Sequence, residues 1–556
     1  MKKIIPLLFI VFLSLSCKAQ VSTEASKIVK EEVASVNPKL VVAIVIDQMR
    51  YDYLTRFESK YGEGGFKRMI EEGFNCKNNH FNYIPTYTGP GHASIFTGTT
   101  PSNHGIIGND WFDKTFGRSV NCVEDNTVEP IGTNSNDGRK SPKRMVVTTF
   151  TDENRLATQM RGKTIGISIK HRGAILPAGH TANAAYWFDY EHNGLGNWIS
   201  STYYMKELPN WVKDFNVSNI TESYFKVWDS FYDINSYTES GSDNNDFERV
   251  FRGKETPTFP YDLNKLKDAN GNFKIIADSP YGNNLTTDFT IAAIDGEGLG
   301  EDDITDILTV SYSSPDKVGH DFGVNSKEIE DIYIRLDKDL KRLFEALDDR
   351  VGKGEYTVFL TSDHGVVNTP KYLQSLKIPS GYYTTKELKA ELNAFILEEF
   401  KTTGLIRNMS NNQIFLNRKK IKDLGLDLTT VQQKIVDEII SYKDIYKAYS
   451  AATMSNNSFP AGVEHLLQNG YNQKRSGDIL TVPYPGYIYH RKKGTTHGSG
   501  FTYDTHVPLL FFGKGIKHGQ TLQKTIIPDI APTISALLGI SFPSGASGQP
   551  LKFVLE

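Results

Sequence analysis

Cysteine is scarce in this sequence, which has only three among its 556 residues, at Cys17, Cys76 and Cys122. A metal site built from several thiolates needs more sulfur than this, so any metal chemistry must use other ligands. Cys17 belongs to a distinct N-terminal segment, which leaves Cys76 and Cys122 as the two that can pair in an oxidising compartment. A disulfide between them and two separately buried thiols both remain open.

The sequence also lacks any run rich in Lys and Arg, and its formal charge is nearly balanced at −3. Bulk electrostatics therefore gives no reason to expect nucleic acid or a polybasic membrane contact, and no protein partner is evident. Apolar residues make up 39% of the chain, which is enough for one large core or several domains. The function must be read from motifs rather than from bulk charge.

The apolar run at the N-terminus is too short to span a bilayer as a helix. A pair of lysines precedes Ile4–Leu13, and small residues lead up to Cys17. This order is typical of an export signal, which we assign to residues 1–20. Cys17 resembles the lipid-modified cysteine of a bacterial lipoprotein, whereas cleavage near Ala19 would release a soluble protein, and both ends remain open. We expect an exported protein that is either periplasmic or lipid-anchored in the cell envelope.

Five apolar runs predict buried strands: Leu40–Ile46, Thr164–Ile169, Asp306–Tyr312, Tyr356–Leu360 and Val507–Phe512. Continuous runs of this kind are typical of strands that are buried on both faces of a parallel sheet. Amphipathic helical patterns separate them, most clearly at Lys327–Leu347. We therefore predict an α/β fold, with a central, mostly parallel sheet flanked by helices on both faces.

Two stretches interrupt this alternation, at about residues 200–285 and 375–495. The first is rich in Tyr, Trp, Asn, Ser and Gly without clean periodicity, and the second contains two more helical patterns and short β-like pieces. We interpret both as insertions into one catalytic domain that spans residues 38–556. Near its end, Pro528 opens a last helix, which Gly539 is placed to terminate.

Acidic and histidine side chains follow the predicted strands where their carboxyl ends would meet. The candidates are Asp47 after the first run, Asp316 and His320 after the third, Asp363 and His364 after the fourth, and His497 shortly before the fifth. The spacing of Asp316 and His320 would place both on one side of a helical turn. Three carboxylates and three imidazoles suit zinc. Each residue taken singly would more often cap a helix or pack, so the joint pattern carries the inference.

A short motif supplies a candidate nucleophile. The segment Tyr83–Ser94 reads Tyr-Ile-Pro-Thr-Tyr-Thr-Gly-Pro-Gly-His-Ala-Ser, and Asn109 follows it. Pro90 in the first turn of a predicted helix makes Thr88 the helix-entry residue, so amide N–H groups and the positive end of the helix dipole would face the site. Thr86 is a competing hydroxyl, and Thr88 could also serve only as a helix cap.

Together these motifs resemble the alkaline phosphatase superfamily, nearest to its PafA-type phosphomonoesterases and its nucleotide pyrophosphatase/phosphodiesterases. The resemblance runs in order from Asp47 to the region of His497 and covers most of the chain. It implies two Zn²⁺ per chain, one held by Asp316, His320 and His497, and the other by Asp47, Asp363 and His364. It also implies that Thr88 is the catalytic nucleophile and a ligand of the second ion, and that Asn109 donates to a phosphoryl oxygen.

The residues Lys170-His171-Arg172 follow the run Thr164–Ile169. If the segment is extended, Lys170 and Arg172 point to the same side. A solvated pair at a strand end is the plain interpretation, but in PafA-type enzymes a Lys-x-Arg at this place contacts the phosphoryl oxygens. The resemblance therefore implies that both residues bind substrate and assist catalysis, and that Lys170 fills the place of a third, magnesium site.

Formal charge favours small-molecule phosphate monoesters as substrates. Two Zn²⁺ balance three aspartates and a threonine alkoxide, so Lys170 and Arg172 add two positive charges, which match a monoester dianion. The pattern Cys-x-Pro-x-Arg occurs nowhere, which argues against a formylglycine sulfatase. We therefore expect an exported, zinc-dependent alkaline phosphatase that acts through a phosphothreonine. The alternatives are a phosphodiesterase, nucleotide pyrophosphatase or phosphonate hydrolase on the same scaffold, and an inactive metal-binding surface protein.

Overall fold

The computed structural model describes residues 37–191 and 194–556, and the part from Asn37 to Glu556 forms one compact unit. The export signal predicted for residues 1–20, with Cys17, lies outside the described residues. Among the residues that are described, none of the helices combines the length and the apolar character needed to cross a membrane.

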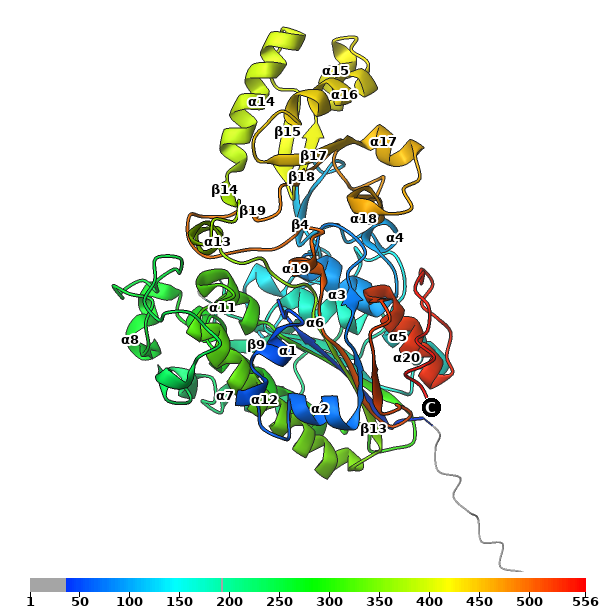
Figure 1. Cartoon of the computed structure of the whole chain (residues 1–556). Coiled ribbons are helices and arrows are strands. Elements are labelled where there is room, and N and C mark those ends of the chain that lie inside the picture. Colours follow the sequence, from blue (N-terminus) through cyan, green and yellow to red (C-terminus); the bar gives the residue numbers. More distant parts are fainter. Residues whose placement is uncertain (1–36, 192–193) are drawn as a thin grey trace, which may run out of the picture. The chain divides into compact units, whose positions relative to one another are not determined.

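A ten-stranded sheet forms the centre of the described unit (Figure 1). Five adjacent strands at its centre run parallel and are, in spatial order, β13 (Tyr356–Thr361), β1 (Leu40–Ile46), β12 (Asp306–Tyr312), β7 (Thr164–Ser168) and β8 (Ala184–Asp189). Every residue of these strands is buried, as the continuous apolar runs predict. The predicted α/β fold with a central, mostly parallel sheet is confirmed.

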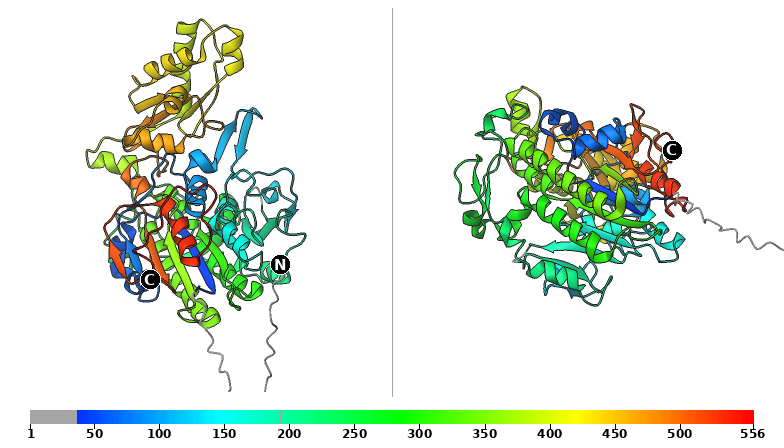
Figure 2. Two further views of the ribbon diagram at one scale, coloured as in Figure 1. Left: turned by 90° about the vertical axis from the view of Figure 1, so that its right-hand side faces the viewer. Right: turned by 90° about the horizontal axis from the view of Figure 1, so that it is seen from below.

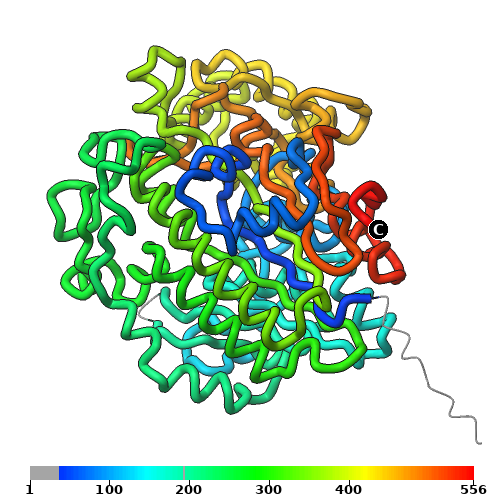
Figure 3. The backbone as a smooth tube through the Cα atoms, turned by 60° about the horizontal axis from the view of Figure 1, so that its bottom comes forward, coloured from blue at the N-terminus to red at the C-terminus, as the bar shows by residue number. Residues whose placement is uncertain are grey.

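One strand runs against the predicted direction. The run Val507–Phe512 was expected to add a parallel strand, but β20 (Leu509–Gly513) pairs antiparallel with both β13 and β2 (Phe74–Cys76). Figure 3 shows the blue chain of β2 beside the orange-red chain of β20 and of β21 (Gly519–Thr521). A continuous apolar run reports burial on both faces, which is typical of parallel strands but does not fix the direction of any single strand.

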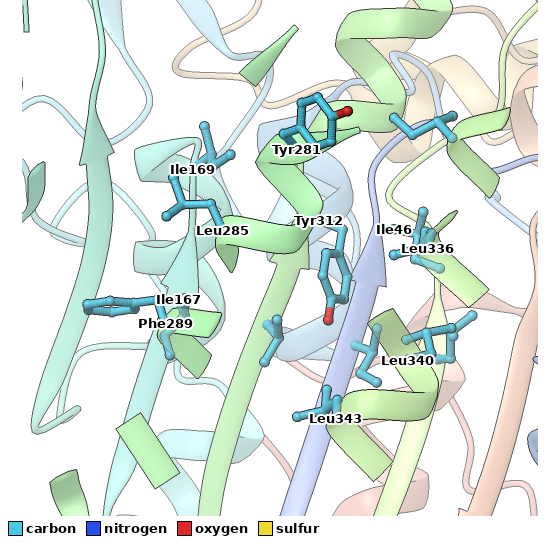
Figure 4. Packing of buried hydrophobic residues seen from close by; sticks show 14 of the residues in the cluster. Ile46, Ile167, Ile169, Tyr281, Leu285, Phe289, Tyr312, Leu336, Leu340 and Leu343 are labelled. Carbon is cyan, nitrogen blue, oxygen red and sulfur yellow. The ribbon is translucent and has the colours of Figure 1, made fainter. Parts of the chain in front are cut away.

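Helices cover both faces of the sheet. The side chains of β1 point alternately to the two faces, so they pack into two different hydrophobic clusters. On one face, Val42, Ile44 and Ile46 pack with α10 (Tyr281–Glu297) and α12 (Lys327–Leu347). Figure 4 shows leucines of α12 and residues of α10 packed against this face. On the other face, the alternate residues of β1 pack with α3 (Thr88–Thr97) and α20 (Ile530–Leu538).

The ends of two predicted helices agree with the sequence. The helix α12 spans Lys327–Leu347, as its apolar spacing predicts, and the Ser326 side chain caps it by accepting from the Ile329 amide. The last helix begins with a short 3₁₀ turn around Pro528, and Gly539 ends it in the left-handed conformation at φ 64°.

The stretch predicted as the second insertion contains a sheet of its own. Its antiparallel strands are β15 (Ile406–Ser410), β16 (Gln413–Leu416), β18 (Ile479–Pro483) and β17 (Ile445–Ser450). They share a separate hydrophobic cluster with α14 (Thr385–Phe400) and α16 (Leu428–Ile439). Figures 1 and 2 show these yellow and orange elements gathered apart from the large sheet.

The stretch at residues 200–285 is organised differently. It forms short elements such as β10 (Val227–Trp228), β11 (Tyr261–Asp262) and α8 (Leu263–Leu266), and its buried side chains join the main cluster rather than one of their own. Trp228, for example, is fully buried and donates its indole N–H to Asp331 of α12 at 2.8 Å.

The two cysteines that fall within the described residues are free and buried. Cys76 lies in the cluster on the α20 side of the sheet, whereas Cys122 lies in a different cluster. The alternative of two separately buried thiols is therefore the correct one.

Candidate metal centre and active site

Three neighbouring strands bring five of the six predicted ligands to one edge of the sheet. In the parallel register, Ile46 of β1 pairs with Tyr312 of β12, and Val45 pairs with Thr361 of β13. Asp47, the residues of α11 (Ser314–Phe322) and Asp363 follow directly after these strand ends. Because the carboxyl ends of parallel strands meet, residues far apart in the sequence converge here.

The six predicted ligands form two groups, and within each group one ligand atom per residue lies within 4.8 Å of the others. The inner group is Asp47, Asp363 and His364, all of them fully buried. The outer group is Asp316, His320 and His497. This is the same division that the resemblance to the alkaline phosphatases implies.

The three histidines are held so that one ring nitrogen of each is available. The Nδ1 atoms of His320, His364 and His497 donate to the carbonyl oxygens of Thr495, Gly365 and Thr86, at 2.8, 3.0 and 2.7 Å. A carbonyl oxygen only accepts, so these bonds place the ring hydrogen on Nδ1 and leave the Nε2 lone pair free for a metal ion.

The carboxylates of the inner group provide a second indication that a cation belongs here. Asp47 Oδ1 and Asp363 Oδ2 are buried and have no hydrogen-bond partner. Burial raises the pKa of both carboxyl groups, and the charge of Asp47 adds to the rise for Asp363. Unpaired buried carboxylate oxygens are costly, whereas a bound divalent cation satisfies them. Carboxylate oxygens and imidazole nitrogens fit zinc.

Asp316 of the outer group is surrounded by partners instead. Its Oδ1 accepts from the Gln48 side chain at 2.7 Å and lies 3.2 Å from His320 Nε2, four residues along α11. Burial works to raise the pKa of Asp316, but His320 and Lys170 together hold that pKa well below its usual value. Asp316 therefore stays ionised through contacts within the protein.

The candidate nucleophile lies beside the inner group. Helix α3 begins at Thr88 itself, after the extended residue Tyr87, and Thr88 Oγ1 is 3.5 Å from His364 Nε2. The competing hydroxyl of Thr86 donates to the carbonyl oxygen of Ser499 at 2.8 Å and is thus already engaged. Asn109 accepts from the amide of Gly89 at 2.7 Å, so its NH₂ group keeps its hydrogens for another acceptor.

Lys170 joins the two groups. Its Nζ lies 2.6 Å from Asp47 Oδ2 and 2.5 Å from Asp316 Oδ2. Burial works to lower the pKa of Lys170, but the charges of Asp316 and Asp47 raise it above its usual value, so the ammonium group stays charged. Arg172 lines the same small cavity as Lys170, and its buried Nε has no hydrogen-bond partner.

The expected geometry of the Lys-x-Arg pair is wrong. The sequence was interpreted as an extended segment after a strand Thr164–Ile169, but β7 ends at Ser168 and α6 (His171–Ala178) begins at His171. Only Lys170 is extended, while Arg172 lies in the first helical turn. The two side chains therefore approach the site from a helix start and not by strand alternation.

Two residues that the sequence did not single out position the ligands. Gln48 donates its amide N–H to Asp363 at 3.1 Å and its side-chain NH₂ to Asp316 at 2.7 Å, so it contacts both groups. It has a φ of 67°, which is uncommon for a residue other than glycine. Asp504 accepts from the amides of Gly498 and Ser499, and so orients the loop that carries His497. The sequence signal for Gln48 was its position, since it is a polar residue directly after the predicted ligand Asp47.

A cavity of about 370 Å³ opens beside the outer group. The core lines it with Asn109 and His497, and the second insertion with Tyr383, Asn411 and Tyr489. A larger apolar cavity of about 670 Å³ shares Tyr487 and Tyr503 with it but includes none of the predicted ligands. We assign the smaller cavity to the active site because its lining brings the ligand residue His497 together with Asn109.

Comparisons with known proteins agree with this geometry. The family model for type I phosphodiesterase/nucleotide pyrophosphatase matches residues 41–507. The alkaline phosphatase PafA of Elizabethkingia meningoseptica is 47% identical, over 93% of this chain and 94% of the relative. The alkaline phosphatase PhoV of Synechococcus elongatus is 45% identical, over 93% of each chain.

Solved structures extend the comparison to three dimensions. The crystal structure of wild-type PafA matches with a TM-score of 0.90 and 46% identity, and the match covers 94% of this chain and 99% of that one. A PafA variant in which a threonine, an asparagine, a lysine and an arginine are replaced matches equally well. This chain thus belongs to the type I phosphodiesterase/nucleotide pyrophosphatase family, within the alkaline phosphatase superfamily, and it is a phosphoric monoester hydrolase of the alkaline phosphatase kind.

Proposed function

We propose that this alkaline phosphatase is an exported zinc enzyme that hydrolyses phosphate monoesters through a phosphothreonine at Thr88. The observation that carries the proposal is the place of the Thr88 hydroxyl, at the start of α3 and 3.5 Å from His364 of the inner group. Two Zn²⁺, one held by each group, would supply the Lewis acidity that activates a hydroxyl and offsets developing negative charge.

Thr88 carries the covalent step of the proposed mechanism. Its Oγ forms a bond to phosphorus while the bond from phosphorus to the leaving oxygen breaks, and the alcohol departs. Water then attacks the same phosphorus, releases inorganic phosphate and restores the Thr88 hydroxyl. The amino end of α3 supports this step because its dipole favours the negative charge of the phosphoryl group.

Three side chains hold the phosphoryl oxygens during both steps. Asn109 has a free NH₂ group next to Thr88, and Arg172 offers a guanidinium with no hydrogen-bond partner at its Nε. Lys170 contributes a charge shared between the two groups. Two cations beyond the neutral metal core match the dianion of a monoester better than the single charge of a diester. In the PafA variant, the same four residue types are replaced in the same order as Thr88, Asn109, Lys170 and Arg172.

The decisive experiment is an activity panel on the zinc-loaded protein. Aryl phosphate monoesters, diesters and sulfate esters are compared by initial rates, and the metal content of the same sample is measured by elemental analysis. We expect about two zinc ions per chain and a clear preference for monoesters. A preference for diesters would favour the phosphodiesterase that the name of the family model suggests.

A second experiment maps the covalent intermediate. Enzyme quenched in acid during turnover is digested, and the phosphorylated peptide is sequenced by mass spectrometry. The label is expected on Thr88, and a label on Thr86 would show that the wrong threonine was chosen.

Export is proposed from residues 1–20. Metabolic lipid labelling that is lost in Cys17→Ala would establish a lipid anchor, whereas an unlabelled mature protein that begins near Ala19 would establish the soluble periplasmic form. An intact Met1 on protein from the cytoplasm would contradict both forms.

A further inference from the structure

A cavity of about 560 Å³ lies on the His320 side of the outer group. The lining comes from α9 (Lys274–Ala277), from α11 and from the chain around residues 249–252 and 490–491. Its five cationic side chains are Arg249, Arg252, Lys274, Lys317 and Arg491. This lining is more positive than the chain as a whole, whose formal net charge is −3.

Only two of these cations are neutralised within the cavity. Asp321 forms an ion pair with Arg249, and Asp278 forms one with Lys274. These are the two carboxylates in the lining. Five cations against two carboxylates leave a formal excess of three positive charges.

The other three cations are Arg252, Lys317 and Arg491. Within the ranges that the structure describes, each lies beyond ion-pair distance of any carboxylate. Lys317 lies over the ring of Tyr190, with its Nζ 5.2 Å from the ring centre. Arg252 and Arg491 are exposed at the cavity and free to meet an anion.

The positive lining connects with the site where the phosphoryl group would bind. Lys317 also lines the small cavity that holds Lys170 and Arg172. The 370 Å³ cavity beside His497 is different, because its lining contains no lysine or arginine and includes Asp110 and Asp504. Positive charge therefore gathers on only one of the two sides from which a substrate can extend beyond the outer group.

We propose that this basic cavity binds a second phosphate group of the substrate, so that the enzyme prefers phosphomonoesters whose leaving group is itself phosphorylated. The inference rests on the proposed function, since it assigns the substrate class of that same site. Phosphate oxygens suit the planar forks of Arg252 and Arg491, each of which donates two parallel hydrogen bonds. The bond cleaved is the same phosphorus–oxygen bond as before, and the second phosphate group leaves unchanged with the alcohol.

The test compares two substrates that differ by one phosphate group. Initial rates of phosphate release are measured for glucose 1-phosphate and glucose 1,6-bisphosphate, with the unmodified enzyme and with Arg252→Ala/Arg491→Ala. We expect the unmodified enzyme to prefer the bisphosphate, and we expect the double variant to lower kcat/KM for the bisphosphate by about tenfold or more, mainly through KM. The kcat/KM for glucose 1-phosphate should change less than about twofold.

A matched control removes the same charge elsewhere. Arg161→Ala/Lys353→Ala also deletes two exposed cations, but these precede β7 and β13 and so lie at the opposite edge of the sheet. This control should keep the preference for the bisphosphate. An equal loss in both double variants would show only a long-range charge effect and would overturn the proposal.

Two further results separate this inference from the proposed function. If the unmodified enzyme cleaves glucose 1-phosphate but shows no preference for the bisphosphate, the cavity assignment is wrong and the proposed function stands. If it cleaves neither, the proposed function fails. Calorimetric titration of Thr88→Ala with glucose 1,6-bisphosphate then tests the cavity directly, since the bound bisphosphate must lose affinity when Arg252 and Arg491 are also replaced.

Discussion

The inner and outer ligand groups differ in how far they are buried and in how many hydrogen-bond partners the protein gives their carboxylates. The inner group is fully buried, and two of its carboxylate oxygens have no partner within the protein. In the outer group, Asp316 already accepts from Gln48 and Lys170, while His320 and His497 line two separate cavities. The fold therefore encloses the inner group and leaves the outer group open toward two cavities, as the proposed mechanism requires of a site that accepts varied leaving groups.

The largest effect should come from Thr88, the proposed nucleophile, which lies beside the inner group. Thr88→Ala should lower kcat for an aryl phosphate by about ten-thousandfold, because it removes the hydroxyl that is proposed to form the covalent intermediate. Thr88→Ser should keep substantial activity. As a control, Thr86→Ala removes a hydroxyl that only donates to Ser499 and should cost far less. Equal losses in the two alanine variants would remove the distinction between the threonines.

Removing the metal ions should expose the difference between the groups. Chelation should lower both activity and the melting temperature. A bound ion stabilises the folded protein by about 4 kcal/mol when its free concentration is a thousand times its Kd. Asp363→Asn and His320→Ala should each bind one zinc ion fewer by elemental analysis, with a loss of activity of about a thousandfold. Because Asp47 Oδ1 and Asp363 Oδ2 have no hydrogen-bond partner, chelation of the His320 variant should still destabilise the protein. An unchanged melting temperature after chelation of the His320→Ala variant would contradict this expectation.

Arg172 offers the cleanest test of the preference for monoesters. Lys170 bridges Asp47 and Asp316, so replacing it would disturb both groups, whereas Arg172 has no hydrogen bond at its buried Nε to lose. Arg172→Ala should lower kcat/KM for monoesters by about tenfold to a hundredfold. Diester hydrolysis should fall much less, because a diester lacks the second charge. If both substrates lose the same factor, Arg172 supports the site generally and the charge argument fails.

The smallest effect should come from Gln48, which touches both groups without reaching the substrate. Gln48→Leu should weaken zinc binding by about tenfold, as expected for a residue that orients metal ligands. The measurement is competition with a chromophoric chelator, alongside kcat at saturating zinc. Activity that returns with added zinc would identify a positioning role. Unchanged zinc affinity would show that the side-chain hydrogen bond from Gln48 to Asp316 is incidental, since the backbone N–H that donates to Asp363 remains in the variant.

Residues next to strand ends were predictable, and residues set by local backbone geometry were not. Asp47 and Asp363 could be assigned because each follows a continuous apolar run, and the meeting of parallel strand ends brings them together. The helical spacing of Asp316 and His320 likewise predicted that their side chains lie on the same side of a helix. Gln48 escaped notice because its left-handed φ and its two bonds depend on tertiary contacts.

Two errors of structure have related causes. The strand β7 ends one residue earlier than its apolar run, so the Lys170–Arg172 segment turns into a helix rather than remaining extended. The direction of β20 depends on which segments pair across the sheet, and so it did not follow from the apolar run. Whether Cys76 and Cys122 pair, which the sequence left open, depends equally on which segments the fold brings together. The apolar pattern of a sequence indicates which segments are buried. It does not show which distant segments pair with each other, because that depends on the whole fold.

The second insertion contributes residues that line cavities at the active site, and none of the six predicted metal ligands lies in it. Tyr383, Asn411 and Tyr489 line the cavity beside His497, while the insertion's own core, around Ile396 and Ile435, is independent of the large sheet. A module with its own core can change its surface without disturbing the metal ligands. Exchanging it among relatives would therefore redesign the entrance of the enzyme while its reaction centre is inherited intact, which makes this segment a natural site for divergence and for engineering.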